Sequence, residues 1–552
     1  MPRRHEPLRS TMMRTPLLLH QVLQRAGQIF PLREVVAREH EGIVRSSWFE
    51  VTRRALRLAS ALERLGIRKG DPVGTLLWNH LPHLELYLGV PAMGGVLHTV
   101  NLRLAPAQVR AIIDHAGDRI LFVEKDLVPF VREHLAGLES VERVIVVGGE
   151  EGGDGGFREY EELVSLGDAS TFTPAALDED DPCGICYTSG TTAEPKGVVY
   201  SHRSTMLHAL VASSGEAFSL RQSSVVLPVV PMFHVNAWGL PYACALCGSK
   251  LVLPGKWLKP GDLLELMTSE EVTMAAGVPT VWMALLDELD RGSPRPPALR
   301  SLLVGGSAAP RPLIKGFHER HGIDVIHAWG MTETSPLGTI STIKPHLAQE
   351  GEALYDLKLS PGLPGALIEL RIRDDDGHVL AHDGKATGEL EIRGPWVTDG
   401  YLDDPEDGRR SMTEDGWFRT GDVARIDAEG YLRIVDRTKD LVKSGGEWIS
   451  SVEIENLLLS HPDVKEAAVI AVRDEKWGER PLACVVPREP GRLDEVALRA
   501  HLEREVPAWQ VPDRFIAVES LPRTSVGKID KKALRRLHPG NPGAGATSGP
   551  EA

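Results

Sequence analysis

The sequence predicts an α/β protein: a large N-terminal domain of layered α/β subdomains with a small β-rich subdomain, followed by a small α+β domain. Three observations predict this fold class. The chain has 552 residues, which is too long for one hydrophobic core. Helical and strand-like patterns alternate over residues 1–345, and residues 362–435 change to short alternating strands. Hydrophobic residues make up 42% and charged residues 25%, the balance of an ordinary globular protein.

The first part of the chain carries the alternation. Residues 48–67 have apolar side chains at helical spacing, and this pattern ends near Gly66. Short apolar runs typical of buried strands follow at residues 72–78 and 119–125, and later at 224–230, 250–254 and 299–306. Strands that alternate with helices predict helices layered on a sheet.

The pattern changes in the last third of the chain. Within residues 362–435, GELEIRG alternates charged and apolar residues and DDDG is a turn sequence, so an antiparallel sheet is expected. After Asp436, two helical stretches flank the strand-like KEAAVIAVRD, which predicts a small α+β unit. Residues 538–552 are rich in Gly and Pro, a composition typical of a disordered tail.

Charge and hydropathy exclude several classes of function. The formal net charge is -15, and a diffuse negative surface disfavours nucleic-acid partners. No apolar run approaches the roughly 18 residues of a membrane helix, so no integral membrane segment is expected. The N-terminus lacks the apolar core of a signal peptide, and the cytoplasm is therefore the default compartment.

The chain contains two C-x-x-C pairs, Cys183/Cys186 and Cys244/Cys247. This pattern binds zinc in other proteins. The distance in sequence between the pairs far exceeds that of a zinc ribbon. Positions i and i+3 of a strand also point to opposite faces. Buried free thiols are therefore favoured over a metal site.

Residues 187–202, YTSGTTAEPKGVVYSH, form the most informative segment. Small hydroxyl residues and glycine let a loop fold its donors around phosphate oxygens, and a lysine adds a point charge. The loop lies between two strand-like runs and lacks the Walker pattern. A mobile surface turn has a similar composition, and composition alone leaves both interpretations open. The candidate phosphate ligands are Thr188, Ser189, Gly190, Thr191, Thr192 and Lys196.

This segment resembles the signature loop of the adenylate-forming superfamily, which includes acyl-CoA synthetases, luciferases and nonribosomal peptide adenylation domains. Seven further motifs follow in family order: PMFHVNAWG (231–239), LLVGGSAAP (302–310), HAWGMTETSP (327–336), GELEIRGPWVTDGY (388–401), GWFRTGD (416–422), DRTKDLVKSGGEWISSVEIE (436–455) and PRTSVGKIDKK (522–532). The resemblance covers all of the chain except its two ends. One departure is Ala193, where the family usually has Gly and where Ala is disfavoured at positive φ.

The resemblance implies a domain plan and a reaction. Residues 1–435 would form the AMP-binding domain, with its β-rich part at 362–435. Residues 436–441 would be a hinge, and residues 442–537 a mobile C-terminal domain. ATP with Mg²⁺ would activate a carboxylic acid as an acyl-adenylate, and coenzyme A would then accept the acyl group. Some relatives form homodimers, which the sequence permits.

The resemblance also assigns roles to nucleotide ligands. Glu333 and the Thr188 hydroxyl would hold Mg²⁺, and Thr332 would hydrogen-bond the α-phosphate. Asp422 would accept hydrogen bonds from the ribose hydroxyls with help from Arg437. The residues around adenine would be Gly306, His327, Ala328 and Trp329, where the family often has Tyr in place of the tryptophan.

Roles in the C-terminal domain follow from the same resemblance. Lys528 would balance charge on the attacked α-phosphate, and Lys439 matches the hinge position. Lys443 and Trp448 would lie near the nucleotide in one domain orientation, and Gly446 would line the pantetheine tunnel. The cations next to the catalytic lysine are expected to be solvated: Lys531, Lys532, Arg535 and Arg536.

The acid-binding pocket is assigned to Trp238, an aromatic gate to an acyl tunnel, and to His234 at its entrance. No acidic residue lies within residues 231–239 to pair with an α-ammonium group, which disfavours amino acids as substrates. The motifs look closest to those of medium- or long-chain fatty acyl-CoA synthetases. Two alternatives stay open: a ligase for short or modified acids such as methylthiopropionate or aryl acids, and a non-catalytic nucleotide-binding module.

Overall fold

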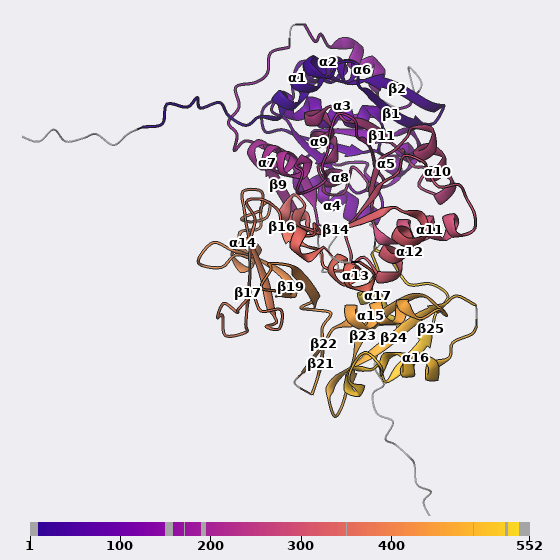
Figure 1. Cartoon of the computed structure of the whole chain (residues 1–552). Coiled ribbons are helices and arrows are strands. Elements are labelled where there is room, and N and C mark those ends of the chain that lie inside the picture. The colour runs from indigo at the N-terminus through magenta and orange to yellow at the C-terminus, as the bar shows by residue number, and fades with distance from the viewer. Residues whose placement is uncertain are drawn as a thin grey trace, which may run out of the picture.

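The computed structural model describes residues 9–539, except residues 150–157, 171, 189–194, 349, 446, 490 and 525–527. In this part of the chain, two large sheets with their helices form an N-terminal α/β unit, and a four-stranded sheet lies beside it (Figure 1). A smaller α+β unit, drawn in yellow and orange, follows at the bottom of Figure 1. The predicted fold class is confirmed.

Two large, mostly parallel sheets organise the N-terminal unit. The nine-stranded sheet runs in the order β16 (Leu363–Pro364), β15 (Leu337–Ile340), β14 (Asp324–Gly330), β13 (Ser301–Val304), β12 (Met274–Gly277), β10 (Val225–Pro228), β11 (Lys250–Leu253), β1 (Glu34–Glu39) and β2 (Gly42–Ser47). The seven-stranded sheet runs in the order β7 (Arg158–Glu159), β6 (Arg143–Val147), β5 (Ile120–Glu124), β3 (Pro72–Leu76), β4 (Val96–Thr99), β8 (Pro182–Tyr187) and β9 (Gly197–Ser201).

Helices cover these sheets. They are α1 (Leu19–Ile29), α2 (Trp48–Arg64), α3 (Leu81–Ala92), α4 (Pro106–Ala116), α5 (Val128–His134), α6 (Tyr160–Leu166), α7 (His202–Ser213), α8 (Val235–Trp238), α9 (Leu240–Cys247), α10 (Pro260–Ser269), α11 (Pro279–Asp290), α12 (Arg311–His321) and α13 (Glu352–Lys358). Helix α2 shows why they form where they do. The Ser47 hydroxyl accepts the Glu50 N–H at 3.2 Å and caps the first turn, and the apolar face of α2 packs against α1 and α3.

The central strands carry the core of this unit. All five residues of β5 are buried, as expected for a parallel strand with helices on both faces. In β13 and β14, Leu302 and Leu303 pair in parallel with Val325 and Ile326. The loops after these two strands therefore begin at the same edge of the sheet, where ligands bind in open α/β sheets.

The β-rich sheet is antiparallel, with the order β17 (Glu369–Arg373), β18 (Gly388–Arg393), β19 (Phe418–Ile426) and β20 (Leu432–Arg437), and α14 (Pro405–Ser411) lies in one of its connections. The predicted DDDG turn follows β17. The Gly377 N–H donates to the Asp374 carbonyl at 3.1 Å, and the φ of +86° at Gly377 favours glycine there.

The C-terminal unit places a sheet against three helices. Its sheet runs in the order β22 (Glu447–Ile449), β21 (Val442–Ser444), β24 (Gly478–Pro487) and β23 (Val464–Asp474), and β25 (Arg514–Ala517) pairs with β24. Its helices are α15 (Ser451–Ser460), α16 (Glu495–Leu502) and α17 (Lys531–Leu537). The positions of the hinge at 436–441 and of the domain limits stay predictions.

All five cysteines are free thiols. Among the described residues, the one group of side chains close enough to hold a metal ion is Asp374, Asp376 and His378, which contains no cysteine. Cys183, Cys186 and Cys244 are buried, as the thiol interpretation expects, whereas Cys247 is half-buried. Within the same part of the chain, none of the helices combines the length and the apolar character that crossing a bilayer requires.

Candidate active site

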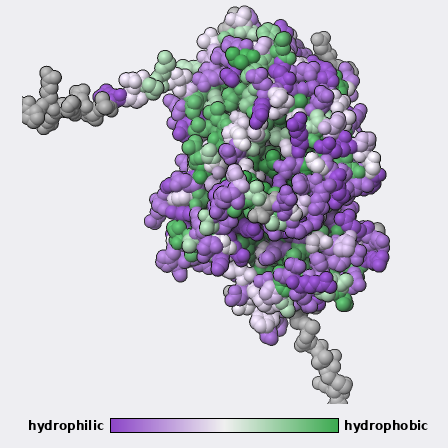
Figure 2. All heavy atoms as spheres, in the orientation of Figure 1, coloured by the Kyte–Doolittle hydropathy of each residue, from purple (hydrophilic) through white to green (hydrophobic). Residues whose placement is uncertain are grey.

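A cavity of about 1330 Å³ lies where the N-terminal unit, the β-rich sheet and the C-terminal unit meet. The loops after β12, β13 and β14 form its floor, which is the edge of the sheet where ligands are expected. Hydrophilic side chains predominate on the face drawn in Figure 2, and the surface is hollowed where the units meet. Such a position lets groups from three parts of the chain act on one ligand.

The phosphate-binding segment lines one wall. The Thr188 N–H donates to the Lys196 carbonyl at 2.9 Å, and the Lys196 N–H donates to the Thr188 hydroxyl at 3.1 Å. These two bonds close the base of a loop between antiparallel strands β8 and β9, as the sequence predicts. Thr188 and Lys196 both line the cavity. The other predicted phosphate ligands lie outside the described residues: Ser189, Gly190, Thr191 and Thr192.

Lys196 has two partners that the sequence analysis missed. Its ammonium group forms an ion pair with Asp407 and lies 4.8 Å from the centre of the Tyr401 ring. The Tyr401 hydroxyl in turn donates to Glu333 Oε1 at 2.9 Å. Tyr401 is the last residue of the motif GELEIRGPWVTDGY, and this position could have indicated a role at the site. Asp407 lies outside all of the motifs, and nothing in the sequence pointed to it.

Glu333 is buried beside Thr332 in the turn that follows β14. Burial raises the pKa of Glu333, while the Tyr401 hydrogen bond and the cations Arg437 and Lys528 oppose that shift. Glu333 and Thr188 line the same cavity and offer one carboxylate and one hydroxyl oxygen. This oxygen-only donor set, with few carboxylates, fits Mg²⁺ that also takes phosphate oxygens and water.

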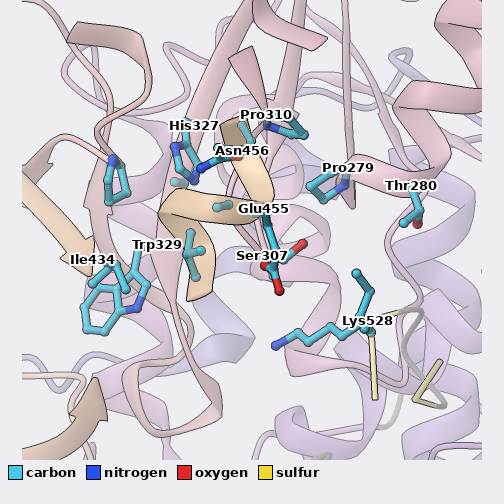
Figure 3. A pocket seen from close by; sticks show the side chains of 18 of the residues that line it. Pro279, Thr280, Ser307, Pro310, His327, Trp329, Ile434, Glu455, Asn456 and Lys528 are labelled. Atoms are coloured by element: carbon cyan, nitrogen blue, oxygen red, sulfur yellow. The ribbon is translucent and has the colours of Figure 1, made fainter. Parts of the chain in front are cut away.

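The predicted adenine-binding residues converge at the ends of β13 and β14. Gly306 has a φ of +82°, and it lines the cavity together with His327, Ala328 and Trp329. The His327 Nδ1–H donates to the Leu359 carbonyl at 3.1 Å, and burial lowers the pKa of His327 to about 4. The imidazole is therefore neutral near pH 7. Figure 3 shows Trp329 and Ile434 on one side of the cavity and Pro279 on the other.

Asp422 lies on β19 and is 1% exposed. Its Oδ2 accepts the indole N–H of Trp329 at 2.8 Å, and its Oδ1 lies 2.6 Å from Nε of Arg437. The predicted ribose-binding pair is thus brought together, and the structure adds Trp329 as a third member. All three residues line the cavity.

Lys528 enters the cavity from the C-terminal unit, with its amino end directed toward the middle of the space (Figure 3). Its Cε would lie 3.7 Å from a Cβ placed on Gly306. Burial lowers the pKa of Lys528 to about 8, with Arg437 acting in the same direction and Asp422 and Glu333 opposing it. The ammonium form still predominates at neutral pH, so the C-terminal unit supplies a positive charge to the cavity.

The remaining predicted residues of the C-terminal unit divide into two groups. Lys439 lines the cavity, and burial lowers its pKa. Lys443 and Trp448 instead stack on each other across the β21–β22 hairpin, 4.1 Å from ammonium to ring centre, and neither lines the cavity in this arrangement. Gly446 lies outside the described residues.

The expectation that the cations beside Lys528 are solvated is wrong for two of them. The Lys531 ammonium lies 2.7 Å from Glu455, and its side chain is 13% exposed. Arg535 lies 2.6 Å from Asp440. Both acids precede α17 by many residues in the sequence, and the fold brings them to it. Lys532 is exposed, as expected.

The predicted acyl-pocket residues lie on an unusual backbone. Four consecutive residues have left-handed φ angles: Val235 (45°), Asn236 (53°), Ala237 (47°) and Trp238 (57°). Such conformations are strained for residues with a Cβ. Trp238 and His234 line the cavity, and the Trp238 indole packs against Gly305, where a Cβ would approach to 3.1 Å. Burial, Lys528 and Arg103 lower the pKa of His234 to about 3, so this ring is neutral.

Comparison with known proteins identifies the family. The model of the AMP-binding enzyme family matches residues 23–402, and that of the AMP-binding enzyme C-terminal domain matches residues 453–528. The chain belongs to the AMP-binding enzyme family. The predicted membership of the adenylate-forming superfamily is confirmed.

Similar proteins of this family include two curated CoA ligases. The long-chain-fatty-acid–CoA ligase of Thermus thermophilus is 49% identical over 535 residues, covering 96% of this chain and 97% of that protein. The 3-methylmercaptopropionyl-CoA ligase of Ruegeria lacuscaerulensis is 42% identical over 533 residues, covering 95% and 98%. Among solved structures, the anthranilate CoA ligase AuaEII in complex with anthranoyl-AMP has a TM-score of 0.85 at 25% identity, covering 95% and 98%.

Proposed function

We propose that this AMP-binding enzyme is an ATP-dependent acyl-CoA ligase for medium- or long-chain fatty acids. It joins the acid to AMP with release of pyrophosphate, and then transfers the acyl group to coenzyme A with release of AMP. The observation that carries the proposal is the position of Lys528, which reaches from the C-terminal unit into a cavity lined by Glu333 and Asp422. A mobile cation facing a nucleotide site is what the first step requires.

In the first step, a carboxylate oxygen of the acid attacks the α-phosphorus, a new O–P bond forms, and the bond to pyrophosphate breaks. Lys528 balances the negative charge that builds on the α-phosphate, and Thr332 orients an oxygen of that phosphate. Asp422 and Arg437 hold the ribose, while Gly306, His327, Ala328 and Trp329 enclose adenine. Mg²⁺, which Glu333 and Thr188 would hold, neutralises charge on the triphosphate when bound.

In the second step, the thiolate of coenzyme A attacks the acyl carbon and AMP leaves. The C-terminal unit rotates about Lys439 within residues 436–441 and replaces Lys528 by the segment around Gly446. Lys443 and Trp448 then move toward the nucleotide. Their distance from the cavity in the present arrangement is consistent with this rotation.

The acid-binding side of the cavity supports an apolar substrate. Trp238 is 7% exposed and packs in the hydrophobic core of the N-terminal unit, and His234 is neutral. Neither side chain attracts a second charge on the substrate. The methylmercaptopropionyl-CoA ligase among the relatives keeps short, sulfur-containing acids as the second candidate. Location in the cytoplasm and assembly as a homodimer stay predictions.

The substrate class is tested by the chain-length profile of the acid. We expect kcat/KM for palmitate or octanoate to exceed that for methylmercaptopropionate or benzoate by about tenfold or more, because each buried methylene contributes about 0.8 kcal/mol. Pyrophosphate release with ATP, coenzyme A and each acid measures this. A clear preference for methylmercaptopropionate would establish the second candidate, and activity with none of the acids would contradict the proposed function.

The Lys196–Asp407 pair gives a second prediction. Asp407→Asn removes the anion that competes with the triphosphate for the Lys196 ammonium. We expect the KM for ATP to fall about two- to fivefold, since an ion pair of such partly exposed side chains is worth about 0.2–1 kcal/mol.

Steady-state kinetics of pyrophosphate release with varied ATP measures the effect of Asp407→Asn. Lys196→Ala is the reference for loss of the cation and should raise the KM for ATP. Asp403→Asn, a nearby substitution that does not contact Lys196, is the matched control. A higher KM in Asp407→Asn would mean that Asp407 positions Lys196 for the phosphate and does not compete with it.

A further inference from the structure

The indole of Trp329 connects two sheets at the nucleotide site. Trp329 lies on β14 of the nine-stranded sheet, and its Nε1–H donates to Oδ2 of Asp422 on β19 of the β-rich sheet at 2.8 Å. The bond joins residues 93 positions apart. Because one partner is a carboxylate, this is a charge-assisted hydrogen bond of the stronger kind.

The fold makes room for an indole at this position. Gly338 lies on β15, which pairs with β14, and the pairing shifts register between Trp329 and Gly330. A Cβ on Gly338 would lie 2.5 Å from Cζ3 of Trp329. The six-membered ring therefore occupies space that only glycine leaves open. The indole also packs against the cores that include Ile372 and Trp396 of the β-rich region.

This arrangement leaves the Asp422 carboxylate with one fixed orientation. Trp329 donates to Oδ2, whereas Oδ1 faces Arg437 in an ion pair and accepts no hydrogen bond among the described residues. A carboxylate has about four lone-pair positions, and those of Oδ1 therefore remain to accept hydroxyl groups. A buried carboxylate that is oriented before the ligand arrives loses less freedom when the ligand binds. Asp422 is 1% exposed, so water does not substitute for a lost partner at low cost.

We infer that Trp329 is a positioning residue for the nucleotide sugar: its indole N–H orients Asp422 toward the ribose hydroxyls and thereby sets the preference for ribonucleotides over 2′-deoxyribonucleotides. The inference rests on the proposed function only in taking the ligand to be an adenine nucleotide. Stacking on adenine is a separate property of the ring, and phenylalanine retains it. The N–H donor is the feature that phenylalanine lacks.

The test compares Trp329→Phe with the unmodified protein in binding AMP and 2′-deoxy-AMP, measured by isothermal titration calorimetry. We expect the unmodified protein to prefer AMP. In Trp329→Phe, the Kd for AMP should rise about tenfold, as for loss of a hydrogen bond to a charged group, and the Kd for 2′-deoxy-AMP should rise less than about threefold. The ratio of the two constants is the readout, because loss of stacking or of local structure weakens both nucleotides alike.

Two further variants complete the experiment. Trp329→Tyr keeps an aromatic ring of the kind that related enzymes often carry here, but it lacks the indole Nε1–H that donates to Asp422, and its hydroxyl donor lies at a different position. Its preference for AMP should therefore also fall. Trp417→Phe, which alters a tryptophan of the β-rich sheet between Arg371 and Arg393, should keep the preference unchanged.

Three results would overturn the inference: an equal loss for both nucleotides in Trp329→Phe, no loss for either, or an unmodified protein that does not distinguish them. Binding is measured without acid or coenzyme A. A protein that binds AMP as expected but releases no pyrophosphate with any acid would therefore contradict the proposed function and leave this inference standing.

Discussion

Lys528→Ala should lower acid-dependent pyrophosphate release by about a hundredfold or more while sparing thioester formation from supplied acyl-adenylate and coenzyme A. The lysine supplies a positive charge inside a buried cavity, where water replaces it poorly, and removing one such group typically costs about 10²–10³ in rate. Only the first step develops charge on an attacked phosphate. The two half-reactions are measured separately, by pyrophosphate release and by acyl-CoA formation.

Lys532→Ala is the matched control for this experiment. Lys532 lies on α17, which follows Lys528 closely in the chain, and its side chain is exposed, so loss of its charge should leave both half-reactions unchanged. Equal losses of both half-reactions in Lys528→Ala would refute the division of labour between the two orientations of the C-terminal unit. Thermal unfolding of each variant reveals whether the substitution has altered stability as well.

Glu333→Gln should also abolish most of the first half-reaction, but unlike Lys528→Ala it should change the dependence of the rate on Mg²⁺. The amide keeps the shape of the side chain and its contact with Tyr401, and it loses the negative charge that would hold Mg²⁺. Charge stabilisation by a metal ion is worth several kcal/mol, so a decrease of about a hundredfold or more in kcat is expected. The concentration of Mg²⁺ needed for half-maximal rate should rise.

The dependence on Mg²⁺ distinguishes the two variants. Lys528→Ala should keep the Mg²⁺ requirement of the unmodified protein, whereas Glu333→Gln should shift it and restore part of its rate at high Mg²⁺. Glu216→Gln, a substitution at an exposed acid that does not line the cavity, serves as the control. An unchanged Mg²⁺ requirement in Glu333→Gln would exclude this carboxylate as a metal ligand.

Much of the fold could be predicted because it depends on local patterns. The helix at α2 and the buried strands β3, β5 and β13 were expected from the spacing of their apolar residues, and the structure places them within a few positions of the predicted limits. The antiparallel sheet after residue 362 was likewise expected from alternation and from the DDDG turn. These patterns appear in the sequence because each element buries apolar side chains at a spacing set by its own geometry.

The partners of the site residues could not be predicted in the same way. Lys531 was expected to be solvated, and the structure pairs it with Glu455. Asp407 and Lys196 are separated by a much longer stretch of chain, and no local pattern links them. The first pair depends on how the helices of the C-terminal unit pack together, and the second on how the β-rich region docks on the large sheets. Docking is decided by the summed burial of many side chains and leaves no periodic signal in the sequence.

The amino-acid sequence by itself determined the fold class and the order of the motifs, and it predicted which groups would meet the nucleotide. Only the tertiary structure decided that Lys528 reaches the cavity beside Glu333, that Asp407 pairs with Lys196, and that the Trp329 indole hydrogen-bonds to Asp422. The physical reason is the separation in sequence over which each interaction acts. Helix and strand patterns act over a few residues, whereas a hydrogen bond across 93 positions exists only after separate sheets have packed together.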